Sequence, residues 1–321
     1  MSVVYALFTL FTLLYCTGCM HMDDFYDAAR QGNIEVMNAM LSSGLVGSIH
    51  RRDSKGNTAI IIAAGRGQVS VLQMLLSYGA HIEDTTKGGL LAGKSVLCWA
   101  ASQGREHAVS YLIEAGANIN RATEDGVFQG KTPLMWASSQ GKKGVVSILI
   151  HAGADIDFAS RGGNFKGKTS LMWASSQGRV DVVITLLEAG ASVDLVDNDG
   201  VSALMWATGS EGDNDESQSK GLFIKAMKGH NDVVKALLHF GASLDLTDKD
   251  GITALMYACF HGHEEAVITL LNAGADASLR NNAGRTAIFL AGSSGHLNVV
   301  GIMKAGPTIM VIHTLLSSFT P

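Results

Sequence analysis

A segment of eleven residues recurs along the chain and limits its fold more than any other feature. Residues 131–141 read Lys-Thr-Pro-Leu-Met-Trp-Ala-Ser-Ser-Gln-Gly, and residues 94–104 and 168–178 repeat them with few changes. Looser copies bring the total to seven, and their opening hydroxyl residues lie 37, 37, 37, 33, 51 and 33 positions apart. A period near 33 with insertions indicates a solenoid whose units each stack on their neighbours.

Each unit follows one internal pattern, which the copy at Thr132 illustrates. The hydroxyl residue precedes a short apolar run, Gly141 follows nine positions later, and a second apolar run at 145–150 ends near Gly153. Both runs have helical spacing and lie between a start signal and a glycine stop. Each unit therefore predicts two short antiparallel helices and a protruding turn, and such a pair buries its apolar faces only within a stack.

The pattern resembles the ankyrin repeat, which runs Asp-x-x-Gly-x-Thr-Pro-Leu-His-x-Ala-Ala and closes with Gly-His, Val-Val, Leu-Leu and Gly-Ala-Asp. The unit 250–276 matches it best, from Asp250-Gly251 through Gly262-His263 to Asp276. The resemblance covers roughly 23–306 and implies an all-α ankyrin-repeat solenoid of about eight helix-turn-helix units with projecting β-turn fingers. An apolar residue replaces the family's His in every copy: Ile61, Cys98, Met135, Met172, Met205, Met256 and Phe289.

Composition and charge argue against several classes of function. The net charge of -5 leaves no basic footprint, so we expect no nucleic-acid partner. The four cysteines form neither a disulfide framework nor the paired Cys-x-x-Cys motifs of a zinc site. Cys98 and Cys259 lie in predicted first helices and are interpreted as small core residues. We therefore expect no metal, no cofactor and no catalytic residue.

The two ends of the chain differ from the repeats. Residues 1–22 lack Asp, Glu, Lys and Arg, and their apolar run followed by Thr17-Gly18 resembles a signal peptide. Residues 16–19 also resemble a degenerate lipoprotein box, and an uncleaved anchor or a hydrophobic cap on the stack are the alternatives. We expect a secreted or membrane-tethered protein of the secretory pathway, with the cytoplasm as the alternative. Residues 307–321 form a hydrophobic tail that is too short to span a bilayer.

Insertions mark four of the units. Three adjacent units carry four extra residues before their first helix, which predicts long fingers at 88–94, 126–131 and 162–168. The sixth unit holds an insertion at 209–226, whose first half is rich in Asp, Glu, Ser and Gly and predicts a solvated loop. Its acids lack the spacing of a calcium loop. Insertions into a solenoid map to one face, often the face that binds.

Two of the long fingers, at 88–95 and 162–169, match the phosphate-loop pattern Gly-x4-Gly-Lys-Ser/Thr. A phosphate loop follows a buried strand, and its backbone N–H groups and Lys hold the phosphate. No apolar strand precedes either finger, and Asp125 breaks the pattern in the middle copy. We interpret the match as a product of the repeat, and an enzyme that binds or hydrolyses NTP is the less favoured alternative.

All four tryptophans occupy one position of the unit, four residues after the hydroxyl residue, and Tyr257 continues the row. We favour a packing row between neighbouring first helices over an aromatic ladder that grips a ligand, because buried aromatic side chains contribute large areas to a core. His261 and His263 resemble a metal pair, but His263 fills the ordinary Gly-His position and no carboxylate cluster joins them.

The remaining candidate for function is the surface. The resemblance implies that partner proteins bind the groove formed by the turn tips and the exposed ends of the first helices. We expect a regular exposed strip of Lys and Gln with Phe at two finger tips; the alternative is that recent duplication left the units alike without a ligand. We predict a monomeric, non-catalytic scaffold for other proteins, or a membrane-tethered structural adaptor. The candidate binding residues are Lys94, Ser102, Gln103, Phe128, Lys131, Ser139, Gln140, Phe165, Lys168, Ser176 and Gln177.

Overall fold

The computed structural model describes residues 22–42, 49–209 and 230–305. The predictions for the C-terminal tail, for all but Met22 of the leader and for all but Gly209 of the insertion at 209–226 concern residues outside these ranges.

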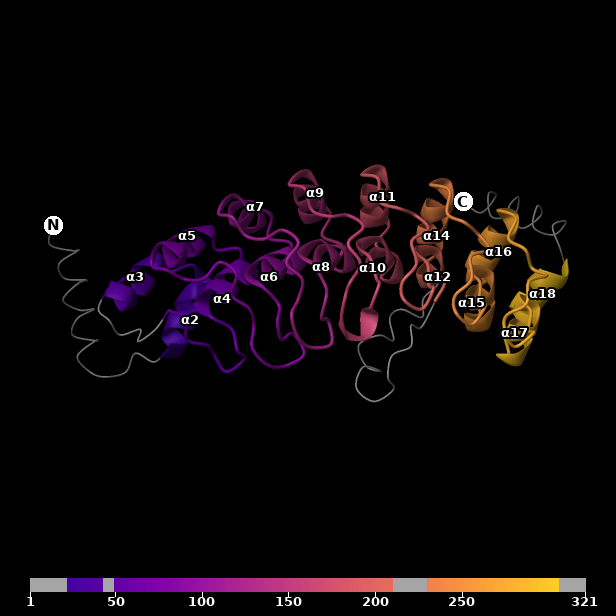
Figure 1. Ribbon diagram of the computed structural model, residues 1–321, viewed down its shortest axis with the longest axis horizontal. Helices are drawn as coiled ribbons and strands as arrows, with labels where there is room; N and C mark the ends of the chain where they lie inside the picture. The colour runs from indigo at the N-terminus through magenta and orange to yellow at the C-terminus, as the bar shows by residue number, and fades with distance from the viewer. Residues whose placement is uncertain (1–21, 43–48, 210–229, 306–321) are drawn as a thin grey trace, which may run out of the picture.

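The described residues form eight consecutive helix pairs, which confirms the all-α ankyrin-type solenoid (Figure 1). Their only β-structure is two isolated bridges, Thr85–Ser95 and Val196–Ser202, and the finger of the fifth unit holds a short 3-10 helix, η1 (Gly163–Phe165). The first helices are α2 (Met22–Gln31), α4 (Ala59–Arg66), α6 (Val96–Gln103), α8 (Pro133–Ser139), α10 (Ser170–Ser176), α12 (Ala203–Ala207), α15 (Ala254–His261) and α17 (Ala287–Ser293). The second helices are α3 (Ile34–Ser42), α5 (Val69–Ser77), α7 (Glu106–Glu114), α9 (Lys143–His151), α11 (Val180–Glu188), α14 (Asn231–His239), α16 (Glu264–Asn272) and α18 (Leu297–Ala305).

The two sets of helices form two layers (Figure 1). Each first helix contacts the first helices of the adjacent units and the second helix of its own unit. The core is a continuous stripe between the layers, built from small and branched side chains such as Ile60, Leu72, Val109 and Leu149. The turns between units project from the side of the first helices (Figure 1). They therefore lie beside the face on which the first helices are accessible.

The hydroxyl residue that opens most units is a helix N-cap. Thr132 Oγ1 accepts a hydrogen bond of 3.3 Å from the backbone N–H of Met135, which satisfies one donor of the first turn. Ser95, Thr169, Ser202 and Thr253 do the same. The cap uses a backbone donor, so it persists although an apolar side chain replaces the family's His.

Neighbouring units are also joined where their two helices meet. Gly67 ends α4 in the left-handed conformation (φ 79°), and a Cβ on it would lie only 3.0 Å from Cδ of Arg105 in the next unit. Arg105 Nε donates to the carbonyl of Gly65, and Arg179 Nε donates to that of Ser139. Each guanidinium therefore lies at the C-terminal end of a preceding first helix, where the helix dipole favours a cation.

Candidate functional site

The turns before the first helices have two forms. In the regular sixth unit, Asp197 accepts hydrogen bonds from the backbone N–H groups of Asp199 and Val201. In the long turn of the fourth unit, Thr123 takes the place of that Asp and lies eight residues, rather than four, before the end of the turn. Thr123 N–H donates to the carbonyl of Lys131, as Asp197 N–H does to that of Val201. The four extra residues are thus accommodated inside one hairpin.

The lysine that ends each long turn is buried, so the prediction of an exposed lysine strip was wrong. The relative exposures of Lys94, Lys131 and Lys168 are 2%, 3% and 2%. Each Nζ donates to a serine Oγ eight residues later, over 2.7 Å to Ser102, 2.8 Å to Ser139 and 3.2 Å to Ser176. The serine sits at the far end of the first helix, so the lysine stem runs beneath the finger along that helix and the next unit covers it.

Each buried ammonium group lies between two indole rings, one from its own unit and one from the next. Cation–π attraction is strongest in such desolvated sites, where it replaces part of the lost hydration. We call these three lysines and four tryptophans the lysine–tryptophan ladder. Its Nζ-to-ring distances are 4.2 and 3.9 Å for Lys94 (Trp99, Trp136), 4.3 and 3.6 Å for Lys131 (Trp136, Trp173), and 4.3 and 3.3 Å for Lys168 (Trp173, Trp206).

Burial shifts the titration of these amines. It lowers the pKa of Lys94 to about 8 and that of Lys168 to about 7, although Asp197 acts in the opposite direction on Lys168. The pKa of Lys131 lies well below its ordinary value, first because of burial and then because Lys168 and Lys94 repel its charge. The amines of Lys94 and Lys168 point into the core, where the lysine of a phosphate loop could not reach a nucleotide. This geometry does not support phosphate loops at 88–95 and 162–169.

The aromatic side chains of the fingers are also buried, contrary to the prediction of exposed tips. Phe128 and Phe165 are 8% and 7% exposed. The Phe128 ring lies 5.1 Å from that of Trp136, and the Phe165 ring lies 4.9 Å from that of Trp173. The fingers of the fourth and fifth units therefore fold onto the first helix and extend the core. The burial of Trp136 and Trp173 agrees with the packing interpretation.

Of the eleven candidate binding residues, only the three glutamines reach solvent. Gln103 and Gln140 are exposed and Gln177 is half-buried, whereas Ser102, Ser139 and Ser176 are buried against the ladder. The glutamines end successive first helices or cap them, and they form a row along the accessible face. Whether this row binds a partner stays a prediction.

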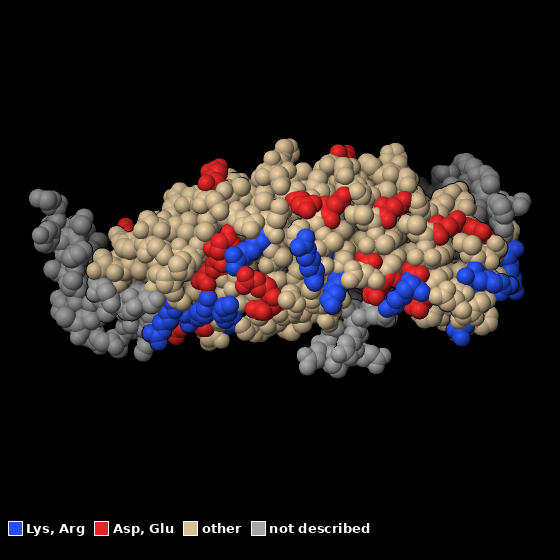
Figure 2. All heavy atoms as spheres, viewed as in Figure 1, with Lys and Arg blue, Asp and Glu red and all other residues tan. Residues whose placement is uncertain are grey.

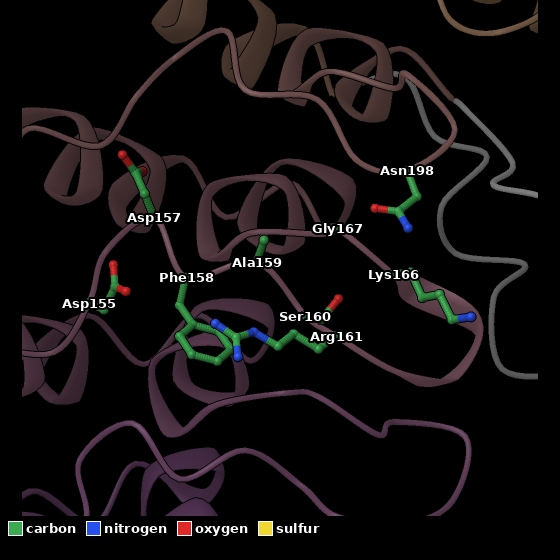
Figure 3. Close-up of a pocket in the computed structure, with 9 residues that line it drawn as sticks. All are labelled: Asp155, Asp157, Phe158, Ala159, Ser160, Arg161, Lys166, Gly167 and Asn198. Atoms are coloured by element: carbon green, nitrogen blue, oxygen red, sulfur yellow. The ribbon is translucent and has the colours of Figure 1, made fainter.

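A cavity of about 410 Å³ lies between the turns of the fifth and sixth units (Figure 3). Arg161 stacks over the ring of Phe158 at 5.7 Å, and Lys166 and Asn198 lie on the opposite side. The carboxylate of Asp157 lines the cavity but is occupied, because it accepts hydrogen bonds from N–H and Oγ of Ser192. The cavity carries charges of both signs, so it selects no ligand charge.

A second concavity of about 310 Å³ lies on the face of α4 and α6, and we call it the first-helix groove. Ile62 and the half-buried Trp99 form part of its floor, and the candidate residue Gln103 lies at its edge. The side chains of Arg30, Lys55, Arg66 and Arg105 also line it, against one carboxylate, that of Asp53.

The sequence interpretation missed these four basic residues. Arg30, Lys55 and Arg66 come from the first two units, outside the long-finger block, and Arg105 lies in the first unit of that block. The net charge of the whole chain does not reveal this local excess of cations. In Figure 2 the Lys and Arg side chains lie on the side of the turns and first helices, mixed with Asp and Glu, and the second-helix edge carries few of them. The one signal in the sequence that indicated the groove was that each of the first three units carries basic residues near its first helix.

Other kinds of site find no support in the described ranges. They contain no group of three or more His, Cys, Asp or Glu residues arranged to hold a metal ion. His261 and His263 stack at 5.8 Å, and burial together with the neighbouring histidines lowers the pKa of His263 to about 4, which keeps it neutral. None of the helices within these ranges has both the length and the apolar character needed to cross a bilayer.

Comparison with known protein families agrees with this architecture. A family model described as ankyrin repeats in three copies matches residues 84–160 and 222–310. A second, described as ankyrin repeats in many copies, matches residues 25–76, and a single ankyrin-repeat model matches residues 166–198. The matches together span most of the chain, including the atypical first unit.

Proposed function

Because the chain belongs to the ankyrin repeat family, whose repeats generally mediate protein–protein interaction, we propose that it is a non-catalytic scaffold that binds another protein on its first-helix face. The observation that carries the proposal is the first-helix groove with the adjoining glutamine row at Gln103, Gln140 and Gln177. There, accessible polar groups surround a half-buried aromatic side chain, as in protein-binding surfaces.

Site-specific photo-crosslinking tests this proposal. A photoreactive amino acid would replace Gln103 or Gln140 on the first helices and, as the matched control, the exposed Glu114 or His151 on the second helices. We expect one partner band from the first-helix positions in the natural host and none from the control positions. Equal crosslinking from both layers, or none from either glutamine, would contradict binding on this face.

We further propose that the protein acts in the secretory pathway, secreted or tethered to a membrane, with the cytoplasm as the alternative. The support is the uncharged, apolar segment at 1–22. Intact mass and membrane partition of the protein from its own host test it. A mass smaller by about twenty residues supports a cleaved leader, added lipid mass supports a tether, and a full-length soluble chain contradicts both.

A further inference from the structure

We propose that the first-helix groove binds an acidic segment of the partner protein, with an apolar side chain of that segment resting on Trp99. The inference rests on the proposed scaffold function and adds to it the chemistry of the partner.

The first argument for an acidic ligand is the charge of the side chains that line the groove. Lys55, Arg66 and Arg105 are exposed, and none of them is paired with a carboxylate of the described residues. Asp53 forms an ion pair with none of the three; its carboxylate accepts hydrogen bonds from the backbone of the turn and lies 3.7 Å from Arg30. Three unpaired cations at one concavity of a chain with net charge -5 favour an anionic ligand.

The second argument, for an apolar residue in the ligand, is the aromatic side chain on the floor of the groove. Trp99 is the first tryptophan of the ladder and the only one of the four that is not buried. Its Nε1 donates to Thr86 and Lys94 lies over its ring, so the side chain is held in place before any ligand arrives. Gly65 keeps the adjacent space open, since a Cβ there would lie 3.7 Å from Cε3 of Trp99. A fixed aromatic surface surrounded by charge is typical of a binding hot spot.

A peptide fits these features better than a nucleic acid does. The cations gather at one groove of about 310 Å³, whereas a polynucleotide needs a basic track along its length. Over the rest of the visible face, Asp and Glu are mixed with Lys and Arg, and no continuous basic track is seen (Figure 2). A short acidic segment that contains one apolar residue satisfies both the rim and the floor.

Fluorescence anisotropy of the full chain tests the inference. The probe is a labelled decapeptide of alternating Asp and Glu around one central Leu; its comparators carry Gln or Lys in place of the acids, and a single-stranded DNA decamer carries phosphate charge. We expect the acidic peptide to bind about tenfold more tightly than the Gln peptide and to weaken as salt rises. An acidic peptide that binds no better than the Lys peptide, or less tightly than the DNA, would overturn the inference.

Charge-reversal variants locate the binding. Lys55→Glu combined with Arg66→Glu should weaken the acidic peptide about tenfold or more. The matched control, Lys304→Glu combined with Lys235→Glu, makes the same change in net charge at exposed residues of α18 and α14 and should leave affinity within about twofold. Equal losses in both variants would place the effect in net charge and overturn the inference.

Gly65→Met separates the groove floor from its charge. Gly65 is helical and lies outside the left-handed region, so a side chain there fills the groove without backbone strain. We expect peptide binding to be lost while the thermal midpoint is unchanged or higher; retained binding would overturn the inference. If crosslinking from Gln103 persists in the Lys55→Glu, Arg66→Glu variant while no acidic peptide binds, this inference fails and the scaffold function stands.

Discussion

The three long-turn units and the regular sixth and seventh units place an aromatic residue at the same position, but their turns present different polar groups to it. In the regular seventh unit, Asp248 of the turn accepts from the hydroxyl of Tyr257 at 2.5 Å and from two backbone N–H groups of its own turn. In the long-turn fourth unit, Thr123 accepts from the indole of Trp136 at 3.0 Å, and the buried Lys131 lies against the ring. The regular turn thus presents one carboxylate to the ring hydroxyl and to its own backbone, whereas the long turn presents a hydroxyl to the indole N–H and a lysine amine to the ring face.

The difference shows how a longer turn changes the coupling between units. A short turn satisfies its own N–H groups through the Asp carboxylate, and it contacts the next unit turn to turn, as Lys249 does with Asp199. All three long turns fill the added space with the stem of Lys, and two of them also with Phe; the lysine amine contacts an indole from the next unit. Each long-turn unit therefore requires a tryptophan-bearing neighbour on its C-terminal side. Trp206, in a unit with a regular turn, ends the ladder.

The largest expected effect comes from removing a tryptophan inside the ladder. Trp173→Ala takes one face from both Lys131 and Lys168 and leaves a cavity beside two buried ammonium groups. We expect the free energy of unfolding to fall by about 3–5 kcal/mol. The matched change in a regular unit, Tyr257→Ala, removes a half-buried ring and should cost about 2 kcal/mol. Urea denaturation followed by circular dichroism measures both, and equal losses would refute a special role for the ladder.

The second-largest expected effect is a dependence of stability on pH, because only the long-turn units contain the buried lysines of the ladder. The folded-state pKa values of Lys94 and Lys168 lie near 8 and 7, below their ordinary 10.5. The unfolded chain therefore binds more protons than the folded chain between about pH 7 and 10.5, so stability rises with pH. The slope is at most about 1.4 kcal/mol per pH unit for each lysine. We expect Lys94 and Lys168 together to contribute a gain of about 2–3 kcal/mol between pH 6.5 and 8.5, and Lys131, whose pKa is also lowered, adds to the gain in the same direction.

The control is the triple variant Lys94→Met, Lys131→Met, Lys168→Met, which keeps the long aliphatic stems without the amines. Its unfolding free energy should be nearly flat over the same range. The buried thiols of Cys98 and Cys259 have raised pKa values that act in the opposite direction, but both proteins carry them and they cancel in the difference. Parallel curves for the two proteins would mean that the indole faces keep the lysines charged throughout.

The sequence predicted the fold far better than it predicted the surface. Repeat spacing, hydroxyl N-caps and glycine stops are local signals, and they located the helix pairs and the packing of the tryptophans correctly. The orientation of Lys131 is not local, because it depends on Trp173 from the next unit. Lysine is almost never buried unless it is paired, so the sequence favoured exposure. The informative signal was that each Gly-Lys-Ser/Thr copy precedes a tryptophan and is followed by another one unit later.

A smaller effect distinguishes the two turn acceptors. Asp197→Ala removes a carboxylate that accepts from Trp206 Nε1 and from two N–H groups of the turn, and we expect a loss of about 2 kcal/mol. Thr123→Val removes one hydroxyl and leaves Trp136 Nε1 without its acceptor, which should cost about 1 kcal/mol. Thermal unfolding compares them. A larger loss for Thr123→Val would mean that the long turn, not the regular one, depends on its acceptor.

The smallest expected effect concerns two adjacent serines of α8. Ser139 Oγ accepts from Lys131 Nζ and donates to the carbonyl of Trp136, whereas the buried Ser138 Oγ has no partner among the described residues. Ser139→Ala should lower the free energy of unfolding by about 1 kcal/mol, because it leaves a buried amine with the two indole faces alone.

Ser138→Ala should be neutral or stabilising by up to about 1 kcal/mol, because it removes an unsatisfied hydroxyl and introduces the residue with the highest helix propensity. Both substitutions delete one oxygen from neighbouring positions of the same helix, so differences in cavity size and exposure are small. Changes of opposite sign in the free energy of unfolding would therefore be due to the hydrogen bond between Ser139 and Lys131. Equal effects of the two substitutions in urea denaturation would mean that the indole rings alone hold the amine of Lys131. The hydrogen bond from Lys131 to Ser139 would then add nothing to stability.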